Sequence, residues 1–286
     1  MLARSSLIAI VLALVPAVAF AQALDGRLKK IKDAKSVSIA YRSDAAPFSF
    51  IDQGKEPVGY SIDLCKRVVS SIEQQIGAAG LTIKWVPVTS QNRFDTIAKG
   101  EADLECASST VTLGRMKTVD FSNYIFIDGT GVIVRAELNA RSLTDLGGKK
   151  IGVVGGTTNE KALAAALKER VVNASVVALK SREEAVQKLE AKEIDAFVSD
   201  TLLLIGLAMQ VKDPKSLQLL DETLSFEPYA ITLPRNDSGL RAAVNTGLAQ
   251  VYRGDAVVEL YGKWFGRLGK PTPALRAVYM LGAVPE

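Results

Sequence analysis

Short apolar strand segments alternate with amphipathic helix segments along this chain, and this order constrains the fold more than any other feature. Residues 36–41 (SVSIAY) alternate polar and apolar side chains, as a strand does, whereas residues 59–76 carry apolar side chains at helical spacing. A strand at 82–88, a helix at 90–100 and a strand at 101–108 follow. Strands that alternate with helices in this way predict a parallel sheet covered by helices.

The same pattern begins again after residue 148. The predicted elements are strands at 149–156, 174–180 and 194–200, the last strands within 216–235, and helices at 157–171, 181–193, 201–211, 236–254 and 255–266. The chain therefore predicts two α/β units, at about 24–128 and 129–230, followed by a helical part. Pro271 and Pro273 predict that the tail, residues 270–286, leaves the last helix as an extended segment.

The first residues have the three-part layout of a secretory signal peptide (1–21). Arg4 precedes the apolar run LIAIVLALVPAVAF, and Ala19-Phe20-Ala21 is a typical cleavage signature. A membrane anchor is the alternative, but the run is short for a spanning helix and contains Pro16. Removal of 21 of the 286 residues leaves 265, which is enough for two lobes with separate cores.

Charge and histidine content exclude several classes of function. The formal net charge of +4 falls to +3 without Arg4, and the charges are interspersed, so nucleic acid is not an expected partner. The chain contains no histidine, which removes Ser-His-Asp and Cys-His triads and most zinc sites. We therefore predict no catalytic residues of these kinds and no metal site.

The two cysteines, Cys65 and Cys106, have 40 residues between them and form no C-x-x-C pair. In an oxidising compartment they could form one disulfide bond. Two buried free thiols are the alternative. Because both cysteines lie within apolar, regular segments, the sequence favours the free thiols.

Two glycines end the predicted strand 149–156 and a helix begins directly after them. No phosphate-binding pattern of the G-x-x-x-x-G-K-[ST] or G-x-G-x-x-G kind is present, so a nucleotide is not expected. Thr157 and Glu160 have the spacing of a capping box. The same helix start offers backbone N–H groups to an anion such as a carboxylate, which is compatible with ordinary capping.

Ser108, Thr110 and Arg115 lie in the stretch SSTVTLGRMKTVDFS, directly after a predicted strand. Ser108 and Thr110 are two residues apart, so their side chains can point the same way. An arginine binds a carboxylate with two parallel hydrogen bonds, and hydroxyls can complete its coordination. An arginine exposed on the surface after a polar loop is the alternative.

Taken together, these segments resemble the extracytoplasmic solute-binding proteins that serve amino-acid ABC transporters. The resemblance rests on PFSFIDQGKEPVGYSIDLCKRV (47–68), on T-x-x-R-x-x-x-V-D-F-S at 112–122, on DLGGKKIGVVGGTT (145–158) and on KLEAKEIDAFVSD (188–200). It extends over nearly the whole chain, from about 36 to 266.

The resemblance implies the α/β fold of a type II periplasmic binding protein. Two lobes, each with a mostly parallel sheet flanked by helices, would be residues 22–128 plus 231–286 and residues 129–230. Crossover strands near 125–131 and 228–233 would join them as a hinge. The resemblance further implies a periplasmic monomer without cofactor or metal, which closes on a small-molecule amino acid and delivers it to a membrane permease.

The resemblance also implies roles for individual residues. The arginine matching Arg115 binds the α-carboxylate, assisted by hydroxyls matching Ser108 and Thr110 and by N–H groups at Thr157 and Thr158. The acid matching Asp200 binds the α-ammonium group. From the residues alone, Asp200 is an ordinary helix N-cap.

The segment TSQNRF (89–94) is most similar to the glutamate/aspartate-binding branch, in which residues matching Arg42, Ser90 and Arg93 line the pocket. One arginine suffices for an α-carboxylate, and further buried arginines need a second anion because buried unpaired cations are costly. The sequence therefore predicts an acidic amino acid, with glutamine and asparagine as alternatives. Surface-exposed arginines at positions 42 and 93 are a further alternative.

Two positions depart from the family. Many members carry an aromatic residue before A-P-F, where this chain has Ala45, so stacking over the ligand is not expected. The dicarboxylate branch can carry a histidine in the second lobe, and Arg182 lies nearest that position. Arg182 is therefore a candidate ligand residue, or a surface residue at a helix start.

A secreted dehydratase-type enzyme on the same fold is the rival interpretation. It would need a general acid or base with a shifted pKa. Glu105, Asp44 and Asp200 are the visible candidates, and the sequence indicates no pair among them. We therefore predict a binding protein rather than an enzyme.

Overall fold

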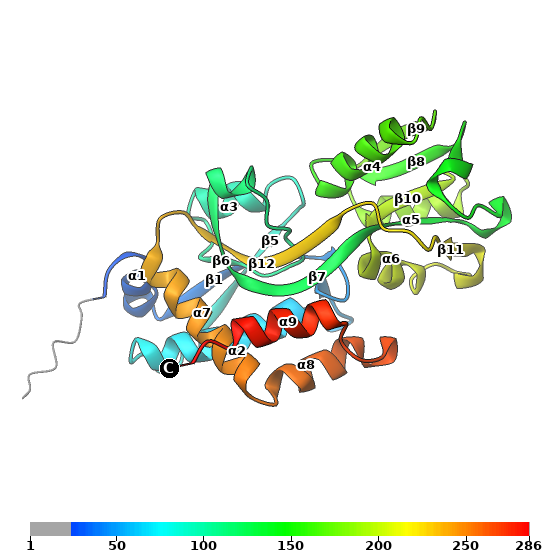
Figure 1. The fold of residues 1–286 in the computed structure, drawn as a ribbon. Helices are drawn as coiled ribbons and strands as arrows, with labels where there is room; N and C mark the ends of the chain where they lie inside the picture. The colour runs from blue at the N-terminus through cyan, green and yellow to red at the C-terminus, as the bar shows by residue number, and fades with distance from the viewer. Residues whose placement is uncertain (1–23, 286) are drawn as a thin grey trace, which may run out of the picture.

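The computed structural model describes residues 24–285, so the predicted signal peptide lies outside the described residues. Figure 1 shows two lobes joined by two long strands, β7 (Val119–Arg135) and β12 (Phe226–Pro234). The two predicted crossover strands are thus confirmed. The domain boundaries predicted at 128/129 and 230/231 fall within these strands and stay a prediction.

A mixed sheet runs through both lobes. Its order is β5–β1–β6–β12–β7 in the larger lobe and continues as β10–β8–β9 in the smaller lobe, with β11 also paired to β7. The remaining strands of this sheet are β1 (Ser36–Arg42), β5 (Thr82–Val88), β6 (Leu104–Glu105), β8 (Lys150–Val154), β9 (Ser175–Leu179), β10 (Ala196–Asp200) and β11 (Leu217–Leu219). Strand β1 is parallel to β5 and β6, and β8 is parallel to β9 and β10. Only the crossover strands and β11 pair antiparallel in this sheet, so each lobe has the predicted mostly parallel core.

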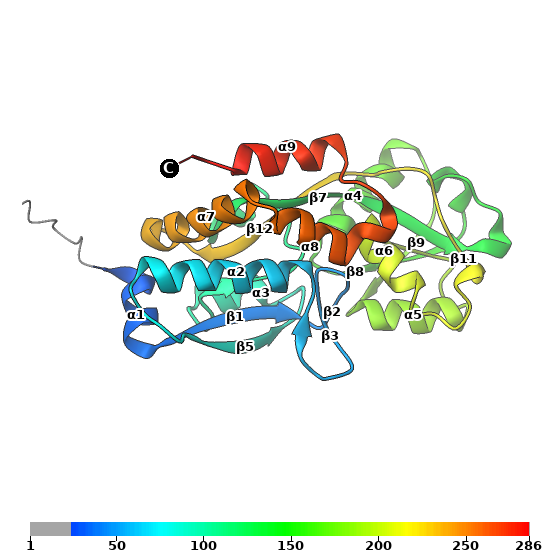
Figure 2. The same ribbon diagram turned by 90° about the horizontal axis from the view of Figure 1, so that it is seen from below.

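Helices cover the sheet of each lobe. The larger lobe carries α1 (Gly26–Ala34), α2 (Tyr60–Gln75), α3 (Arg93–Ala98), α7 (Ser238–Arg253), α8 (Ala256–Phe265) and α9 (Pro273–Gly282). The smaller lobe carries α4 (Thr158–Glu169), α5 (Arg182–Glu190) and α6 (Thr201–Ala208). Figure 2 shows α2, α7, α8 and α9 gathered on one face of the larger lobe.

Short elements complete the described chain. A small sheet is formed by β2 (Asp44–Ala45), β3 (Ser49–Ile51) and β4 (Pro57–Val58). The 3-10 helices are η1 (Arg115–Lys117), η2 (Ala136–Leu138), η3 (Leu143–Leu146), η4 (Pro214–Ser216) and η5 (Gly266–Leu268).

Aromatic rings fill the core of the larger lobe where α2 and α8 meet the crossover strands. The ring of Phe48 lies 5.0 Å from that of Phe126 and 5.1 Å from that of Tyr229. Gly59, at the start of α2, has φ +135°, and a Cβ built there would lie 2.2 Å from the Phe48 carbonyl oxygen. Only glycine therefore fits between the P-F-S-F segment and α2.

The C-terminal tail is helical rather than extended, which corrects the prediction from its prolines. Pro273 occupies the first turn of α9, where a missing N–H costs nothing, and Thr272 accepts a hydrogen bond from Leu275 N–H as the N-cap. Helix α9 packs against α7 and β7. The predicted strand at 101–108 is also shorter than expected, since only residues 104 and 105 pair in β6.

Cys65 and Cys106 form a disulfide bond, and the prediction of free thiols is wrong. Both cysteines are fully buried, as their apolar surroundings indicated. Burial fits a free thiol and a disulfide equally well, so it could not decide between them. The bond forms because α2 packs over the end of β6 and brings the two Cα atoms within 6.4 Å of each other, which is a usual distance for a disulfide. The bond ties α2 to the segment that leads into Ser108 and Thr110.

Candidate ligand-binding site between the lobes

The ten predicted ligand residues lie at chain segments where the two lobes face each other. The larger lobe contributes Arg42 at the end of β1, Ser90 and Arg93 at the start of α3, and Ser108, Thr110 and Arg115 from the segment after β6. The smaller lobe contributes Thr157 and Thr158 at the start of α4, Arg182 at the start of α5, and Asp200 at the end of β10. Binding residues at the carboxyl ends of parallel strands are typical of α/β folds.

The lobes are in close contact beside these residues. Side chains of Asp44, Ala46, Arg182, Leu203 and Leu207 line a cavity of ≈ 210 Å³ between them. Gly206 of α6 approaches the backbone of Ala46, because a Cβ built on Gly206 would lie 2.6 Å from the Ala46 carbonyl oxygen. The smaller lobe therefore meets the larger one through a glycine that leaves no space for a side chain.

Four arginines converge on this region. Arg42, Arg93 and Arg182 are buried, and the guanidinium groups of Arg93 and Arg115 lie 4.8 and 4.7 Å from the ring centroid of Phe94. Burial lowers the pKa of Arg42 and of Arg93 to about 10, and the positive charges of neighbouring arginines add to this effect. The arrangement is therefore a buried concentration of positive charge.

Asp44 is the shared partner of two of these arginines. It forms an ion pair with Arg42, and its Oδ2 lies 3.4 Å from Arg182 Nη1 across the two lobes. Burial alone would raise the pKa of Asp44, but Arg182 and Arg42 outweigh it and lower the pKa below its usual value. The argument that Arg42 needs an anion from a ligand is thus corrected, because the chain itself supplies a counter-charge two residues away.

The other two arginines have no such partner. Among residues 24–285, neither Arg93 nor Arg115 has a carboxylate within 4.0 Å. Arg115 Nη1 donates to the Thr110 carbonyl oxygen at 2.7 Å. Within the same part of the chain, Arg42 Nη1, Arg93 Nε and Ser90 Oγ are buried and have no hydrogen-bond partner. Unpaired buried donors of this kind are rare in proteins.

The start of α4 is capped as the sequence predicted. The Thr157 hydroxyl accepts from Glu160 N–H and donates to the Val154 carbonyl oxygen, and the Glu160 carboxylate accepts from Gly156 N–H. The single proton of the Thr157 hydroxyl is therefore used within the helix cap. A hydrogen bond donated by Thr157 to a ligand carboxylate would have to come from its backbone N–H, as at other helix N-termini.

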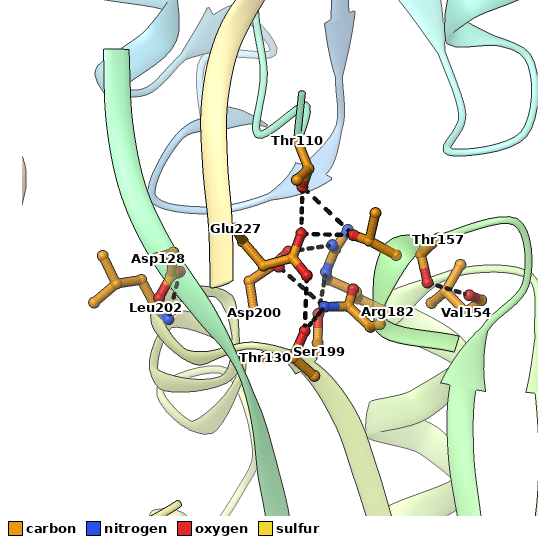
Figure 3. A network of polar contacts seen from close by, with 12 residues as sticks. Thr110, Asp128, Thr130, Val154, Thr157, Arg182, Ser199, Asp200, Leu202 and Glu227 are labelled. Atoms are coloured by element: carbon orange, nitrogen blue, oxygen red, sulfur yellow. Dashed lines mark hydrogen bonds and ion pairs between the residues drawn. The ribbon is translucent and has the colours of Figure 1, made fainter. Parts of the chain in front are cut away.

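Glu227 is a site residue that the sequence prediction missed. Figure 3 shows its carboxylate at the centre of a hydroxyl network between the lobes. It accepts hydrogen bonds from Thr110 (2.5 Å), Thr158 (2.7 Å), Thr130 (3.1 Å) and Ser225 (2.6 Å). The available signal was a glutamate next to the otherwise apolar strand PYAITLP, which predicts a buried carboxylate.

Asp200 belongs to the same network and does not cap α6 with its side chain. Its Oδ1 accepts from Asn159 Nδ2 at 3.0 Å, and its Oδ2 lies 3.8 Å from Arg182 Nη2. Burial raises the pKa of Asp200, and the nearby Glu227 adds to this effect. Burial, with a contribution from Asp200, also raises the pKa of Asp128 on β7 to about 7.

The network joins some predicted residues and leaves others apart. Thr110 and Thr158, from different lobes, have hydroxyls 3.4 Å apart. Arg182 contacts Asp44, Ser199 and Asp200. Ser90 and Ser108 are buried, yet their hydroxyls form no hydrogen bond with another residue of the described chain. The segment carrying Ser108 is held on β12, where Ala230 N–H donates to the Ser109 carbonyl oxygen.

Among the residues that the structure describes, no group of three or more acidic or cysteine side chains is arranged so that it could hold a metal ion. No helix between residues 24 and 285 is long and apolar enough to cross a membrane.

Comparison with known proteins shows the family of this chain. The sequence matches the bacterial extracellular solute-binding proteins, family 3, over residues 37–267. It is 33% identical to an L-glutamate/L-aspartate-binding protein of Pseudomonas aeruginosa over 90% of this chain and 85% of that protein. It is 29% identical to the glutamate/aspartate import solute-binding protein of Escherichia coli, over 86% of this chain and 81% of that protein.

A solved structure supports the same conclusion. An ancestral arginine-binding protein bound to arginine is similar with a TM-score of 0.73 and 28% identity, over 81% of this chain and 99% of that one. The family match covers most of the chain and includes both lobes and both crossover strands. The chain therefore belongs to the bacterial extracellular solute-binding proteins of family 3.

Proposed function

We propose that this protein binds glutamate or aspartate outside the cytoplasmic membrane and delivers it to the permease of an ABC transporter. The observation that carries the proposal is the pair of arginines, Arg93 and Arg115, without an ion-pair partner among the described residues. An acidic amino acid has two carboxylates, one for each of them. The names of the relatives from P. aeruginosa and E. coli support the same ligands.

Each charged group of such a ligand has a complementary set of protein groups. Arg115, Ser108 and the backbone N–H groups at Thr157 and Thr158 would bind the α-carboxylate. Arg93, Ser90 and the free Nη1 of Arg42 would bind the side-chain carboxylate, since all three have unpartnered buried polar atoms. Asp200 and the Thr110 hydroxyl would bind the α-ammonium group.

Arg182 keeps a place in the proposed site, but in a different role from the one its sequence position suggested. It contacts Asp44 of the larger lobe and Asp200 of the smaller lobe. Its positive charge therefore orients the acid that receives the ammonium group, and its ion pair with Asp44 links the two lobes.

Ligand binding would stabilise the form in which the lobes are closed. A ligand that contacts both lobes has a higher affinity for the closed form, and this difference shifts the population toward it. The hinge would be the pair β7 and β12. We further propose a periplasmic monomer, exported through the signal peptide, that binds neither nucleic acid nor a cofactor.

An acid with a raised pKa favours one alternative, a dehydratase on the same fold. Asp200 lies among the predicted ligand residues and its pKa is raised, which a general acid requires. Incubation of the purified protein with prephenate tests this alternative directly. Turnover of prephenate without stabilisation by any amino acid would replace our proposal with the enzyme.

Calorimetric titration of the purified protein tests the proposed function. We expect glutamate and aspartate to bind more tightly than glutamine and asparagine. Arg93→Gln should weaken glutamate binding about tenfold to 150-fold, because a charged hydrogen bond contributes about 1.5–3 kcal/mol, and should affect glutamine much less.

Arg135→Gln is the matched control, because Arg135 is also largely buried but pairs with Asp195 in the smaller lobe. It should leave the affinities for all four ligands unchanged. Tight binding of only neutral or basic amino acids, or an Arg93→Gln variant with normal glutamate affinity, would contradict the proposed dicarboxylate site.

A further inference from the structure

Four hydroxyl groups surround the buried carboxylate of Glu227, and they come from both lobes. Thr110 of the larger lobe and Thr158 of the smaller lobe both donate to Oε2. Thr130 and Ser225 both donate to Oε1. Glu227 itself lies on the crossover strand β12, and only 1% of its surface is exposed.

This arrangement fixes the direction of the two hydrogen bonds to Oε2. An ionised carboxylate can only accept hydrogen bonds, so Thr110 and Thr158 direct their single protons toward Glu227. Ser225 also lies 2.8 Å from Thr130 Oγ1, so these two hydroxyls share their protons between Oε1 and each other. Among residues 24–285, no arginine or lysine nitrogen lies within 4.0 Å of the Glu227 carboxylate, so hydroxyls are its hydrogen-bond donors there. The oxygens of Thr110 and Thr158 then have only lone pairs left for any other partner.

Asn159 connects this hydroxyl network to the carboxylate of Asp200, which is the other hydrogen-bond acceptor of the site. Asn159 Nδ2 donates both to Thr130 Oγ1 at 2.8 Å and to Asp200 Oδ1 at 3.0 Å, and so connects the Glu227 network to Asp200. The hydroxyls of Thr110 and Thr158 are 3.4 Å apart, which is too long for a strong bond between two groups that both donate elsewhere. The Thr110 and Thr158 hydroxyls therefore present lone pairs, and no proton, to a ligand group bound at Asp200.

We propose that Glu227 is a positioning residue that fixes the Thr110 and Thr158 hydroxyls as acceptors, so that the site requires an α-ammonium group and rejects the 2-oxo acid. The inference rests on the proposed function, because it concerns the same ligand. An ammonium group donates to these oxygens. The carbonyl of a 2-oxo acid has no proton to donate and would face lone pairs and a carboxylate.

Glutamate and 2-oxoglutarate are the probes, because both carry two carboxylates and differ only at the α-position. Calorimetric titration gives the ratio of their dissociation constants for each variant. Glu227→Ala releases the hydroxyls, so that they can turn and donate to the 2-oxo group. We expect the preference for glutamate to fall at least about tenfold, with a gain in 2-oxoglutarate affinity that general damage to the fold would not produce.

Glu105→Ala is the matched control for the loss of one buried carboxylate. Glu105 is fully buried and accepts hydrogen bonds from Ser109 at 2.9 Å and Thr232 at 2.7 Å, but it contacts neither Thr110 nor Thr158. Its removal should change the affinities for both ligands together and leave their ratio unchanged. An equal change of the ratio in both variants would overturn the proposal.

Thr158→Val tests the inference without a change of charge. It replaces Glu227→Ala as the test variant if Glu227→Ala does not fold. Loss of the Thr158 oxygen should weaken glutamate binding and leave 2-oxoglutarate binding unchanged or stronger. An unaltered ratio in Thr158→Val would overturn the proposal.

The wild-type protein separates failure of this inference from failure of the proposed function. Tight glutamate binding with equally tight 2-oxoglutarate binding would overturn the role of Glu227 alone. If a different amino acid binds instead, the proposed function fails, and the same variants are measured with that amino acid and its 2-oxo acid. Absence of binding by every amino acid would overturn both.

Discussion

Replacement of Gly206 by alanine should weaken ligand binding while it stabilises the helix that carries it. Gly206 lies within α6 of the smaller lobe and faces the backbone of Ala46 in the larger lobe. A Cβ at position 206 would lie 2.6 Å from the Ala46 carbonyl oxygen and 3.2 Å from its carbonyl carbon. Backbone atoms cannot turn aside as a flexible side chain can, so the lobes themselves must separate.

The size of the effect follows from that distance. An ordinary contact begins near 3.4 Å, so the lobes would have to move apart by about 0.8 Å at this point, and overpacking of this kind costs about 1–3 kcal/mol. Only the closed form carries this cost. Because the ligand binds the closed form, the dissociation constant should rise about fivefold to 150-fold. Alanine is favoured over glycine in a helix by about 1 kcal/mol in either form, so the unliganded protein should melt no lower than wild type.

Gly262→Ala is the matched control. Gly262 lies within α8 of the larger lobe, and nothing is within 4 Å of a Cβ built on it. Both variants should retain or raise the melting temperature without ligand, measured by calorimetry, but only Gly206→Ala should lose affinity in titration. A Gly206→Ala protein with wild-type affinity would refute the reasoning, because it would mean that the ligand-bound form does not bring α6 against Ala46.

Three further predictions concern buried groups. The pKa of Asp128 is raised to about 7 in the folded protein, against an ordinary value of 3.8, so between these pH values the folded state binds a proton that the unfolded state has lost. The free energy of unfolding should therefore fall by about 4 kcal/mol as pH rises from 4 to 8. Asp128→Asn should reduce this fall in thermal melts at several pH values, and an unchanged pH profile would contradict the shift. The double variant Cys65→Ala/Cys106→Ala removes a disulfide that spans 41 positions, and urea unfolding should show a loss of about 4 kcal/mol; a loss under 1 kcal/mol would mean that the bond constrains the unfolded chain little. Asp44→Asn removes the negative charge shared by Arg42 and Arg182, so the positive charge of these arginines should attract the side-chain carboxylate of glutamate more strongly. The preference for glutamate over glutamine should rise about tenfold in calorimetric titration, and a lower preference would show that Asp44 does not offset these arginines.

Much of the fold could be predicted from the sequence because many of its elements have a local signal. Periodic apolar residues marked β1, α2 and β5, whereas the role of β7 and β12 as crossover strands was expected from the family resemblance. The tail was predicted wrongly because the prolines were taken as helix breakers, although Pro273 follows a capping threonine and therefore starts a helix. Strand β6 was shorter than its apolar run, since pairing depends on the neighbouring strands and not on the run itself.

The candidate site was predictable only in part. Residue types after predicted strands indicated Arg42 and Arg115, because loops at strand ends meet in the fold. Asp200 was indicated only by the family resemblance, since its position alone predicts an ordinary helix N-cap. The sharing of Asp44 by Arg42 and Arg182 was not predictable, since 138 positions separate Asp44 from Arg182 and only the contact of the lobes brings them together. Glu227 was missed because its four hydroxyl donors come from four separate segments of the chain, which only the folded structure brings together.

The location of both ends of the described chain, residues 24 and 285, on one lobe has a consequence for any attempt to use this protein as an optical sensor. Helix α1 near residue 24 and helix α9 near residue 285 both belong to the larger lobe (Figure 2). Two fluorophores attached at these ends would move together, and energy transfer between them would not change when the lobes close. One label must instead be placed on the smaller lobe, where Val171, 90% exposed at the turn after α4, offers a position away from the ligand residues.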